Sequence, residues 1–182
     1  MSRDGEQGVG WPVVVLPYDV RWPALFGAER DRLAEIFGER AAGIEHIGST
    51  AVPGLAAKEI VDILLGLRPL ELGPEDLDAM ARLGYVYRGE LGIPGRHFFQ
   101  KGEPPTHHVH AVEHGSVEWL KHVHFRDHLR AHAGDAQSYA KLKRDLATRH
   151  PNDRDAYTEG KSPFVAAVLR RASRGSGTPA RG

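Results

Sequence analysis

The chain has 182 residues, enough for a single domain that buries its own core without disulfides or a structural metal. It contains no cysteine, which excludes disulfides, thiolate zinc sites, iron–sulfur clusters and cysteine nucleophiles and fits a cytoplasmic location. Lys and Arg number 24 and Asp and Glu number 24, so no broad basic surface for coating nucleic acid is expected.

Hydrophobic spacing and turn residues predict the elements in chain order. The first part indicates an edge strand at 13–16, a helix at 23–38, strands at 44–47 and 60–67, and a helix at 74–83. Three more strands are expected at 85–88, 96–101 and 107–113, then helices at 116–132, 134–149 and 161–171. This order predicts an α+β domain in which helices cover a mixed β-sheet and the C-terminal part is helical.

The two ends of the chain are poor in apolar residues. Residues 1–10 are polar and Gly-rich, and residues 172–182 consist mainly of Gly, Ser, Arg and Pro. We therefore expect a domain at 11–171 between a flexible N-terminus and a disordered tail. The run 60–67 is far shorter than the ~20 residues of a membrane span, and no signal-peptide core is present, so no membrane partner is expected. The neutral net charge is compatible with a homodimer.

A Gly-Ser turn follows the predicted strand at 44–47. Gly48 allows a sharp turn, and Ser49 and Thr50 bring a hydroxyl and backbone N–H groups to one point, an arrangement that can hold phosphate. The alternative is an ordinary turn in which Ser49 or Thr50 caps a short helix, and the turn alone favours that alternative.

Asp62 favours the phosphate-binding interpretation of this turn, because it places a carboxylate inside an apolar strand. Ionised carboxylates are almost never buried without a partner, so Asp62 needs a metal ion, a cation such as Lys58, or a hydrogen-bond donor. A Gly-Ser turn followed after twelve residues by a strand carboxylate can hold a nucleoside triphosphate. The turn would bind the phosphates and Asp62 would bind Mg²⁺.

The stretch EHIGSTAVPGLAAKEIVDILLGL at 45–67 strongly resembles the GrpB family. Further matching segments cover nearly the whole chain except its ends: YDVRWP at 18–23, LGY at 83–85, RHFF at 96–99, THHVH at 106–110, FRD at 125–127 and YAKLK at 139–143. The resemblance implies a nucleotidyltransferase-like fold related to the polymerase-beta-type superfamily. It also implies that such a domain is fused to dephospho-coenzyme A kinase in some actinobacteria, but it does not define an activity.

The sequence departs from the pattern of active nucleotidyltransferases, which carry two carboxylates at alternating positions of one strand so that both can share two Mg²⁺ ions. Ile60 and Leu64 occupy the positions two residues before and after Asp62. Either another residue replaces the missing ligand, or two-metal chemistry has been lost. Glu59 stands where the family commonly has Pro and is a candidate extra acid, although on a straight strand it faces away from Asp62.

The chain has 11 histidines, and two of them are candidates to replace the missing ligand. His108 and His110 alternate on the strand at 107–113, so both face one side and suit metal binding or proton relay. The alternative is a pair of half-exposed sheet residues satisfied by hydrogen bonds. Beside Asp62 and the Gly-Ser turn we expect a functional role. His124, His128 and His132 are spaced four residues apart and are expected to form the polar flank of a helix.

Basic residues supply the remaining candidates for phosphate binding: Lys58, Arg96, Arg126 and Lys161, with Lys101 and Lys143 also considered. Arg126 lies in the Phe-Arg-Asp segment that the resemblance marks as a family feature. It could pair with Asp62 or hold a phosphate with two parallel hydrogen bonds. Lys161 matches the family as well, and Lys101 is expected to be an ordinary solvated lysine.

These observations predict a metal- and ATP-dependent nucleotidyl or related group transferase that acts on a small-molecule acceptor. Asp62, His108 and His110 are the expected catalytic and metal-binding residues, with Mg²⁺ or Mn²⁺ as the cation and ATP or another nucleoside triphosphate as substrate. One alternative is a module that binds a nucleotide or coenzyme A without catalysis. Another is a hydrolase whose metal is held by Asp62 and the two histidines. The acceptor cannot be deduced from the sequence.

Overall fold

The computed structural model describes residues 11–175, and its strands form a single mixed sheet, as predicted. The strands are β1 (Ala41–Ile47), β2 (Val61–Leu67), β3 (Tyr85–Tyr87), β4 (His97–Lys101) and β5 (His107–Glu113). The helices are α1 (Trp22–Phe37), α2 (Pro74–Arg82), α3 (Val117–Ala131), α4 (Ala133–Arg149), α5 (Arg154–Glu159) and α6 (Ser162–Gly175), with 3₁₀ turns at Gly38–Arg40 and Ser49–Ala51.

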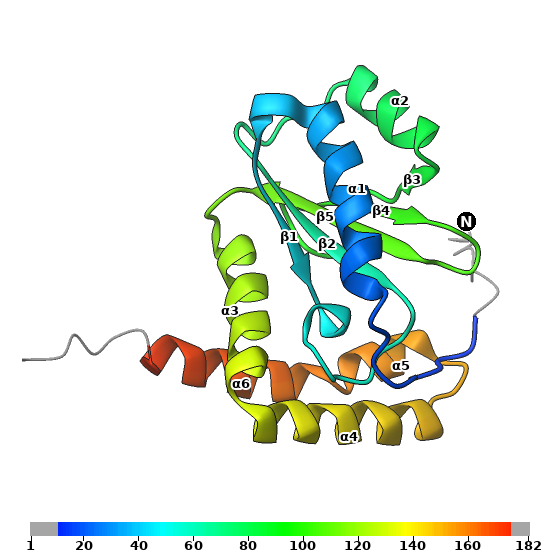
Figure 1. The fold of residues 1–182 in the computed structure, drawn as a ribbon, viewed down its shortest axis with the longest axis vertical. Helices are drawn as coiled ribbons and strands as arrows, with labels where there is room; N and C mark the ends of the chain where they lie inside the picture. Colours follow the sequence, from blue (N-terminus) through cyan, green and yellow to red (C-terminus); the bar gives the residue numbers. More distant parts are fainter. Residues whose placement is uncertain (1–10, 176–182) are drawn as a thin grey trace, which may run out of the picture.

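The sheet has the strand order β1-β2-β5-β4-β3 (Figure 1). β2 and β5 run parallel at its centre, and the other neighbouring pairs are antiparallel. The register places Asp62 beside His108 and Leu64 beside His110. The strand that carries the histidine pair is therefore the direct neighbour of the Asp strand, as replacement of the missing ligand requires.

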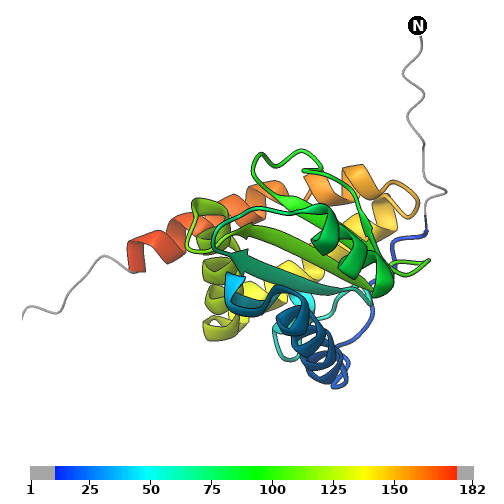
Figure 2. The ribbon, with the colours of Figure 1, turned by 90° about the horizontal axis from the view of Figure 1, so that it is seen from above.

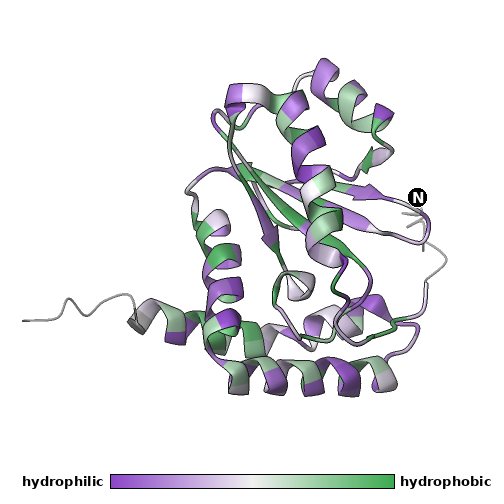
Figure 3. Ribbon diagram, viewed as in Figure 1, coloured by the Kyte–Doolittle hydropathy of each residue, from purple (hydrophilic) through white to green (hydrophobic). Residues whose placement is uncertain are grey.

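Helices cover both faces of the sheet (Figure 2). α1 and α2 pack on the face that carries Ile63 and Leu65, which are fully buried with Val109 in the main core. α3 packs on the opposite face, where Trp119 meets Leu64. Hydrophobic residues follow β2 in Figure 3. Because side chains alternate along a strand, Asp62 shares the α3 face with Leu64.

One predicted strand, one missing helix and one helix end need correction. Residues 13–16 do not form an edge strand, because their ladder contact is a single bridge between Leu16 and Ala57. A short helix at 154–159 was not predicted; it begins after Pro151, and the Asp153 side chain caps it by accepting from the Ala156 N–H at 2.9 Å. α6 continues to Gly175, four residues beyond its predicted end.

The expected flexible segment at 1–10 and the expected tail from 176 onward lie outside the described residues. Within the described part, no helix is long and apolar enough to cross a membrane.

Two glycines allow Trp119 to lie flat against the sheet. A Cβ added to Gly66 would come within 2.6 Å of the Trp119 ring, and one on Gly43 within 2.8 Å. The neighbouring strands β1 and β2 thus present a flat patch to the indole, and this contact fixes α3 over the face that carries Asp62.

We expect Gly66→Ala to lower the free energy of unfolding by about 1–3 kcal/mol, because the added methyl group overlaps the Trp119 ring in a packed interior. Urea denaturation measures the change. Gly27→Ala in α1 is the matched control: nothing lies within 4 Å of its added Cβ. Removing a helical glycine there should raise stability by up to about 1 kcal/mol. Equal effects of the two substitutions would contradict the packing role.

Candidate functional site

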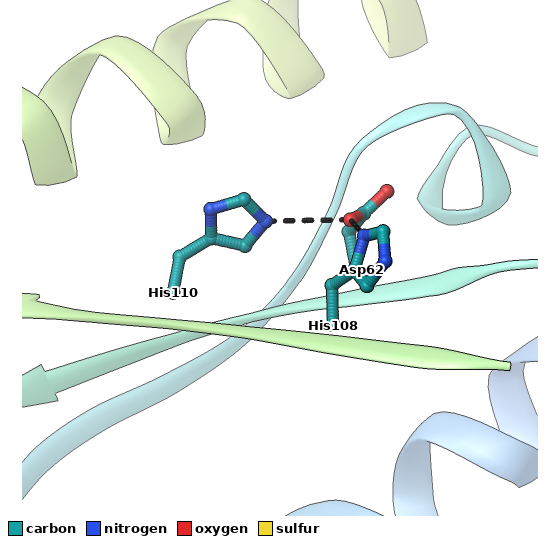
Figure 4. A group of neighbouring side chains, drawn as sticks. All are labelled: Asp62, His108 and His110. Carbon is teal, nitrogen blue, oxygen red and sulfur yellow. Dashed lines mark hydrogen bonds and ion pairs between the residues drawn. The ribbon is translucent and has the colours of Figure 1, made fainter. Parts of the chain in front are cut away.

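Asp62 meets both predicted histidines in front of the parallel strands β2 and β5 (Figure 4). Its Oδ1 lies 3.2 Å from His108 Nδ1 and 3.3 Å from His110 Nε2. The carboxylate is 28% exposed, whereas the His108 and His110 side chains are 16% and 12% exposed. Three residues proposed from the sequence thus converge at one point.

The charge of Asp62 determines which nitrogens of His108 and His110 carry a proton. Burial would raise the pKa of Asp62, but the hydrogen bonds from His108 and His110 outweigh it and hold the pKa well below its usual range. An ionised carboxylate only accepts, so the two imidazole nitrogens that reach Oδ1 must donate. Oδ1 is therefore occupied by two imidazole N–H groups. Figure 4 shows that Oδ2 points away from both rings.

Gly48 lies against the outer side of this carboxylate. Its φ is +70°, and a Cβ added there would lie 2.7 Å from Asp62 Oδ2. Glycine is required at this position both for the left-handed backbone and for the close approach. The turn at Gly48 and Ser49 and the free side of Asp62 therefore border the same space.

Lys143 of α4 reaches the other side of the turn. Its Nζ donates to Ser49 Oγ at 2.7 Å and to the Ala56 carbonyl, and the residue is only 2% exposed. Burial, together with the charges of Lys161, Arg144 and Lys58, lowers the pKa of Lys143 to about 7. This lysine was a minor candidate in the sequence, where only its place in the YAKLK segment pointed to it.

The partly buried Lys58 and Lys161 join the buried Lys143 in a group that we call the lysine cluster (Lys58, Lys143 and Lys161). The Lys161 ammonium lies 4.6 Å from the centre of the Tyr157 ring, and that of Lys58 lies 5.2 Å from it. Burial lowers the pKa of Lys161 to about 8, with a further contribution from Lys58. Burial likewise lowers the pKa of Lys58, although the charge of Asp62 opposes the shift for both. Three buried or partly buried ammonium groups of like charge gain from a bound anion.

Arg96 and Arg126 occupy positions different from those expected. Arg96 is buried behind His110, and its Nη1 lies 3.3 Å from His110 Nδ1. Arg126 donates to Glu45 at 2.5 Å, to the His46 carbonyl at 3.1 Å and to Asp127 at 2.8 Å. The expected pairing of Arg126 with Asp62 is therefore not formed, because Glu45 and Asp127 satisfy the guanidinium.

The other predicted residues have structural surroundings. Thr50 is buried, and its hydroxyl lies 2.9 Å from His46 Nε2. This bond makes only the backbone of Thr50 a candidate for phosphate contact. Glu59 is exposed beside the strand. Lys101 is not simply solvated, because its Nζ lies 2.8 Å from the buried Glu29.

The helical histidines are not close to Asp62 through any contact that the structure shows. His128 is buried and its Nε2 lies 2.7 Å from Asp135 Oδ2, while its ring stacks on that of His132 at 4.0 Å. His128 therefore helps join α3 to the start of α4. The expectation of a polar flank holds in part, since its middle member is buried.

The trio meets the distance requirement for a metal site. One ligand atom each from Asp62, His108 and His110 lies within 4.8 Å of the others. A single cation between them would need a lone pair on each nitrogen, and Asp62 Oδ2 offers a second position toward Gly48. Mg²⁺ prefers oxygen ligands, and the oxygen of Asp62 that accepts from neither imidazole is Oδ2.

A hollow of about 560 Å³ lies beside the lysine cluster, between residues 52–56 and the ends of α3 and α4. Its walls include Val52, Leu129 and Ala140, with Arg130 and Arg144 at its polar positions. It shares Ala56 with the site, because the Ala56 carbonyl accepts from Lys143. Asp62 does not line this hollow.

The family model described as GrpB protein matches residues 12–171. A UPF0157 protein of Pseudomonas aeruginosa is 46% identical over 166 residues, covering 88% of this chain and 67% of that protein. UPF0157 protein YqkA of Bacillus subtilis is 40% identical over 163 residues, and the matched part covers 89% of this chain but 48% of YqkA. This chain thus spans about half the length of that relative.

The fold is similar to a solved structure titled conserved protein GrpB from Enterococcus faecalis. The TM-score is 0.79 at 36% identity, and the match covers 90% of this chain and 99% of that one. A more distant match is a protein named dephospho-CoA kinase from Mycolicibacterium paratuberculosis, 28% identical over 187 residues, which cover 46% of that protein.

Proposed function

Because this chain belongs to the GrpB family, and because the buried Lys143 and the carboxylate of Asp62 border one Gly-Ser turn, we propose that it binds a nucleoside triphosphate with a divalent cation and transfers the nucleotidyl group to a small acceptor. The observation that carries the proposal is the Ser49 hydroxyl held 2.7 Å from Lys143 beside the approach of Gly48 to Asp62. Anion-binding and cation-binding groups are then adjacent, as a metal–triphosphate complex requires.

The phosphates are assigned to the lysine cluster and the turn. Lys143 and Ser49 already share a hydrogen bond, so a phosphate oxygen can replace part of that contact without moving the backbone. Lys58 and Lys161 supply the charge, and a bound anion offsets the burial and the repulsion that lower their pKa values. The backbone at Ser49 and Thr50 is the remaining phosphate contact that we assign.

The cation is assigned to Asp62 Oδ2, because Oδ1 accepts from both imidazoles. Asp62 Oδ2 would hold the divalent cation, whose contribution would be to neutralise phosphate charge and polarise the phosphorus. The protein's own contribution is to fix Asp62 from behind with His108 and His110, and to place Gly48 where no side chain blocks the approach.

His108 is assigned as the general base. Its Nδ1 donates to Asp62, so in the neutral ring Nε2 keeps its lone pair. An acceptor hydroxyl, amine or carboxylate attacks the α-phosphorus, where a new bond to phosphorus forms while the bond to the β-phosphate oxygen breaks and pyrophosphate leaves. The proton of a hydroxyl or amine acceptor passes to His108 Nε2.

A module that binds a nucleotide or coenzyme A without catalysis is the second candidate. The observation in its favour is Leu64, which is fully buried where active relatives in the superfamily would carry a second carboxylate. The distant relative named dephospho-CoA kinase also fits this possibility. A single carboxylate can still hold one cation, which is why transfer remains our first proposal.

A thermal shift assay with ATP tests metal-dependent binding. We expect ATP with Mg²⁺ or Mn²⁺ to raise the melting temperature more than ATP with a chelator, because the cation bridges Asp62 and the phosphates. At a ligand concentration 100 times Kd, the stabilisation is about 2.7 kcal/mol. Equal stabilisation without metal would contradict the assignment of Asp62.

Pyrophosphate release in the presence of candidate acceptors then separates transfer from simple binding. Release that depends on an acceptor supports a nucleotidyltransferase. Metal-dependent binding with no pyrophosphate from hydroxyl, amine or carboxylate acceptors supports the binding module. Inorganic phosphate released without pyrophosphate would instead indicate hydrolysis of the triphosphate end.

A further inference from the structure

Arg96 is a buried cation whose hydrogen bonds, as far as the described residues show, go to neutral groups. It is 6% exposed. Its Nε and Nη2 lie 3.2 and 3.1 Å from the Glu90 carbonyl, and Nη2 lies 2.9 Å from the Leu91 carbonyl. The guanidinium also lies 5.0 Å from the centre of the Phe98 ring. The remaining nitrogen, Nη1, points at His110 Nδ1 from 3.3 Å.

The segment before β4 is shaped around this guanidinium. Leu91 has a φ of +45°, which a side chain rarely adopts, and the Gly95 N–H donates to the Glu90 carboxylate at 2.7 Å. These features turn the carbonyls of Glu90 and Leu91 inward. Arg96 is therefore held in place by backbone groups. The sequence suggested that Arg96 binds phosphate, but these contacts leave its guanidinium closed to one.

We propose that Arg96 is a positioning residue that holds His110 in the form protonated on Nε2. A guanidinium has no acceptor and keeps its protons, so His110 Nδ1 must be the acceptor of this contact. A neutral imidazole carries one proton, which is then on Nε2. That proton is the one donated to Asp62 Oδ1 across 3.3 Å.

These contacts, from Arg96 to His110 and from His110 to Asp62, then prevent His110 from acting as a metal ligand. A ligating nitrogen needs its lone pair, so a cation on His110 Nε2 would move the proton to Nδ1. Nδ1–H would then face the N–H of Arg96 across 3.3 Å, donor against donor. Metal-binding histidines instead direct the other N–H at a carboxylate, a carbonyl or water. His110 is thus a hydrogen-bond donor that fixes Asp62, and the three-ligand site with His108 does not form.

His108 differs from His110 in this respect. Its Nδ1 donates to Asp62, and this leaves Nε2 with a lone pair for a proton or a cation. His122 is the other imidazole near His110, at 5.2 Å between ring centres, but its Nε2 lies 3.2 Å from Glu118. The two members of the H-x-H pair therefore have different roles, and the buried Arg96, just before strand β4, determines which role each has.

Nitrogen-15 NMR of the histidine side chains in protein free of metal and nucleotide tests the proton positions directly. We expect His110 to show a protonated Nε2 and an unprotonated Nδ1, and His108 to show the opposite pattern. His110 resonances are assigned from their loss in His110→Gln. A proton on His110 Nδ1, or an imidazolium in neutral solution, would overturn the proposal. Because no ligand is present, this result stands apart from the proposed function, on which only the role of the cation rests.

A titration with Co²⁺ alone, which prefers nitrogen ligands more than Mg²⁺ does, tests the consequence for metals. Arg96→Met removes the opposing donor, so we expect Co²⁺ to bind about tenfold to hundredfold more tightly than to the unaltered protein. The gain should vanish in Arg96→Met with His110→Gln. Arg88→Met, at an exposed arginine nearby, should leave Kd unchanged.

A second test keeps Arg96 in place and so does not depend on the folding of Arg96→Met. The affinity of His110→Gln for Co²⁺ should lie within about twofold of that of the unaltered protein, because Gln keeps a donor for Asp62. A loss of tenfold or more would show that His110 is a ligand and would overturn the proposal. Unchanged Co²⁺ affinity in a folded Arg96→Met protein would overturn it as well.

Discussion

Replacing Asp62 with Asn should remove the metal-dependent part of ATP binding. The substitution keeps the size of the side chain and an oxygen that can accept from the imidazoles, but it removes the charge that holds a divalent cation at Oδ2. Stabilisation by ATP with Mg²⁺ should then fall to the level seen with a chelator. If an acceptor supports pyrophosphate release, its rate should fall on the order of 10³-fold, since metal catalysis contributes several kcal/mol.

Glu59→Gln is the matched control for Asp62→Asn. It makes the same chemical change at an exposed carboxylate three residues away. We expect no change in metal-dependent stabilisation, because Glu59 lies outside the contacts of the site. An Asp62→Asn protein that folds and keeps full metal dependence would refute our site. A loss in Glu59→Gln would show that the extra acid considered from the sequence takes part after all.

Lys143→Met should weaken nucleotide binding by about tenfold to hundredfold. A hydrogen bond to a charged group contributes about 1.5–3 kcal/mol, and Lys143 is the cluster member that contacts Ser49. The substitution should not destabilise the free protein, because it removes a buried cation that burial already disfavours. Calorimetry with ATP and a melting curve without ligand measure the two effects.

Lys141→Met is the control for this effect, since Lys141 is an exposed lysine on the same helix. It should leave the Kd for ATP unchanged. Equal losses in the two variants would indicate a general effect of positive charge rather than a defined phosphate contact. A Lys143→Met protein with unaltered affinity would show that the lysine cluster is not the phosphate site.

The pH dependence of anion binding gives a further test of the cluster. Burial lowers the pKa of Lys143 to about 7 and that of Lys161 to about 8. As pH rises through these values the free protein loses the protons that an anion needs, so affinity falls. Sulfate is the probe to use, because its own charge stays constant in this range. Affinity that rises with pH, or a decline that persists unchanged in Lys143→Met, would contradict the assignment.

The pH dependence of folding has the opposite sign. The unfolded chain keeps its lysines protonated up to their ordinary pKa of 10.5, while the folded protein releases protons from Lys143 at about 7. Between these two values the unfolded state binds more protons, so the contribution of Lys143 to stability rises with pH. A saturating anion should reduce this rise, since it favours the charged lysines in the folded state.

Most of the secondary structure could be predicted from local patterns. β2 is a nearly continuous apolar run, α1 shows helical spacing from Leu25 to Phe37, and α2 begins at a proline. The predictions were wrong where the local pattern was misleading or too short to detect. Residues 13–16 look like a strand but have a single bridge to pair with, and the six-residue helix at 154–159 is too short to produce a periodic pattern.

The sequence by itself determined the family, the mixed sheet, the shared face of His108 and His110, and the need of Asp62 for a partner. Alternation on a strand places both histidines on one face, and a carboxylate in an apolar strand demands a partner. These are properties of neighbouring residues, so they can be read from spacing alone. The family resemblance covered the same segments that the family model matches.

Only the tertiary structure decided what each charged residue does. Lys143 is 94 residues from Ser49 in sequence, yet its ammonium completes the turn, whereas Arg126 is bound by Glu45, 81 residues away. Arg96 faces His110 because its segment folds back over β5. Charge, burial and proton position depend on distances across the fold, and spacing along the chain does not contain them. The two histidines look equivalent in the sequence, but in the structure only His110 has Arg96 at its second nitrogen, which is the basis for the different roles that we propose.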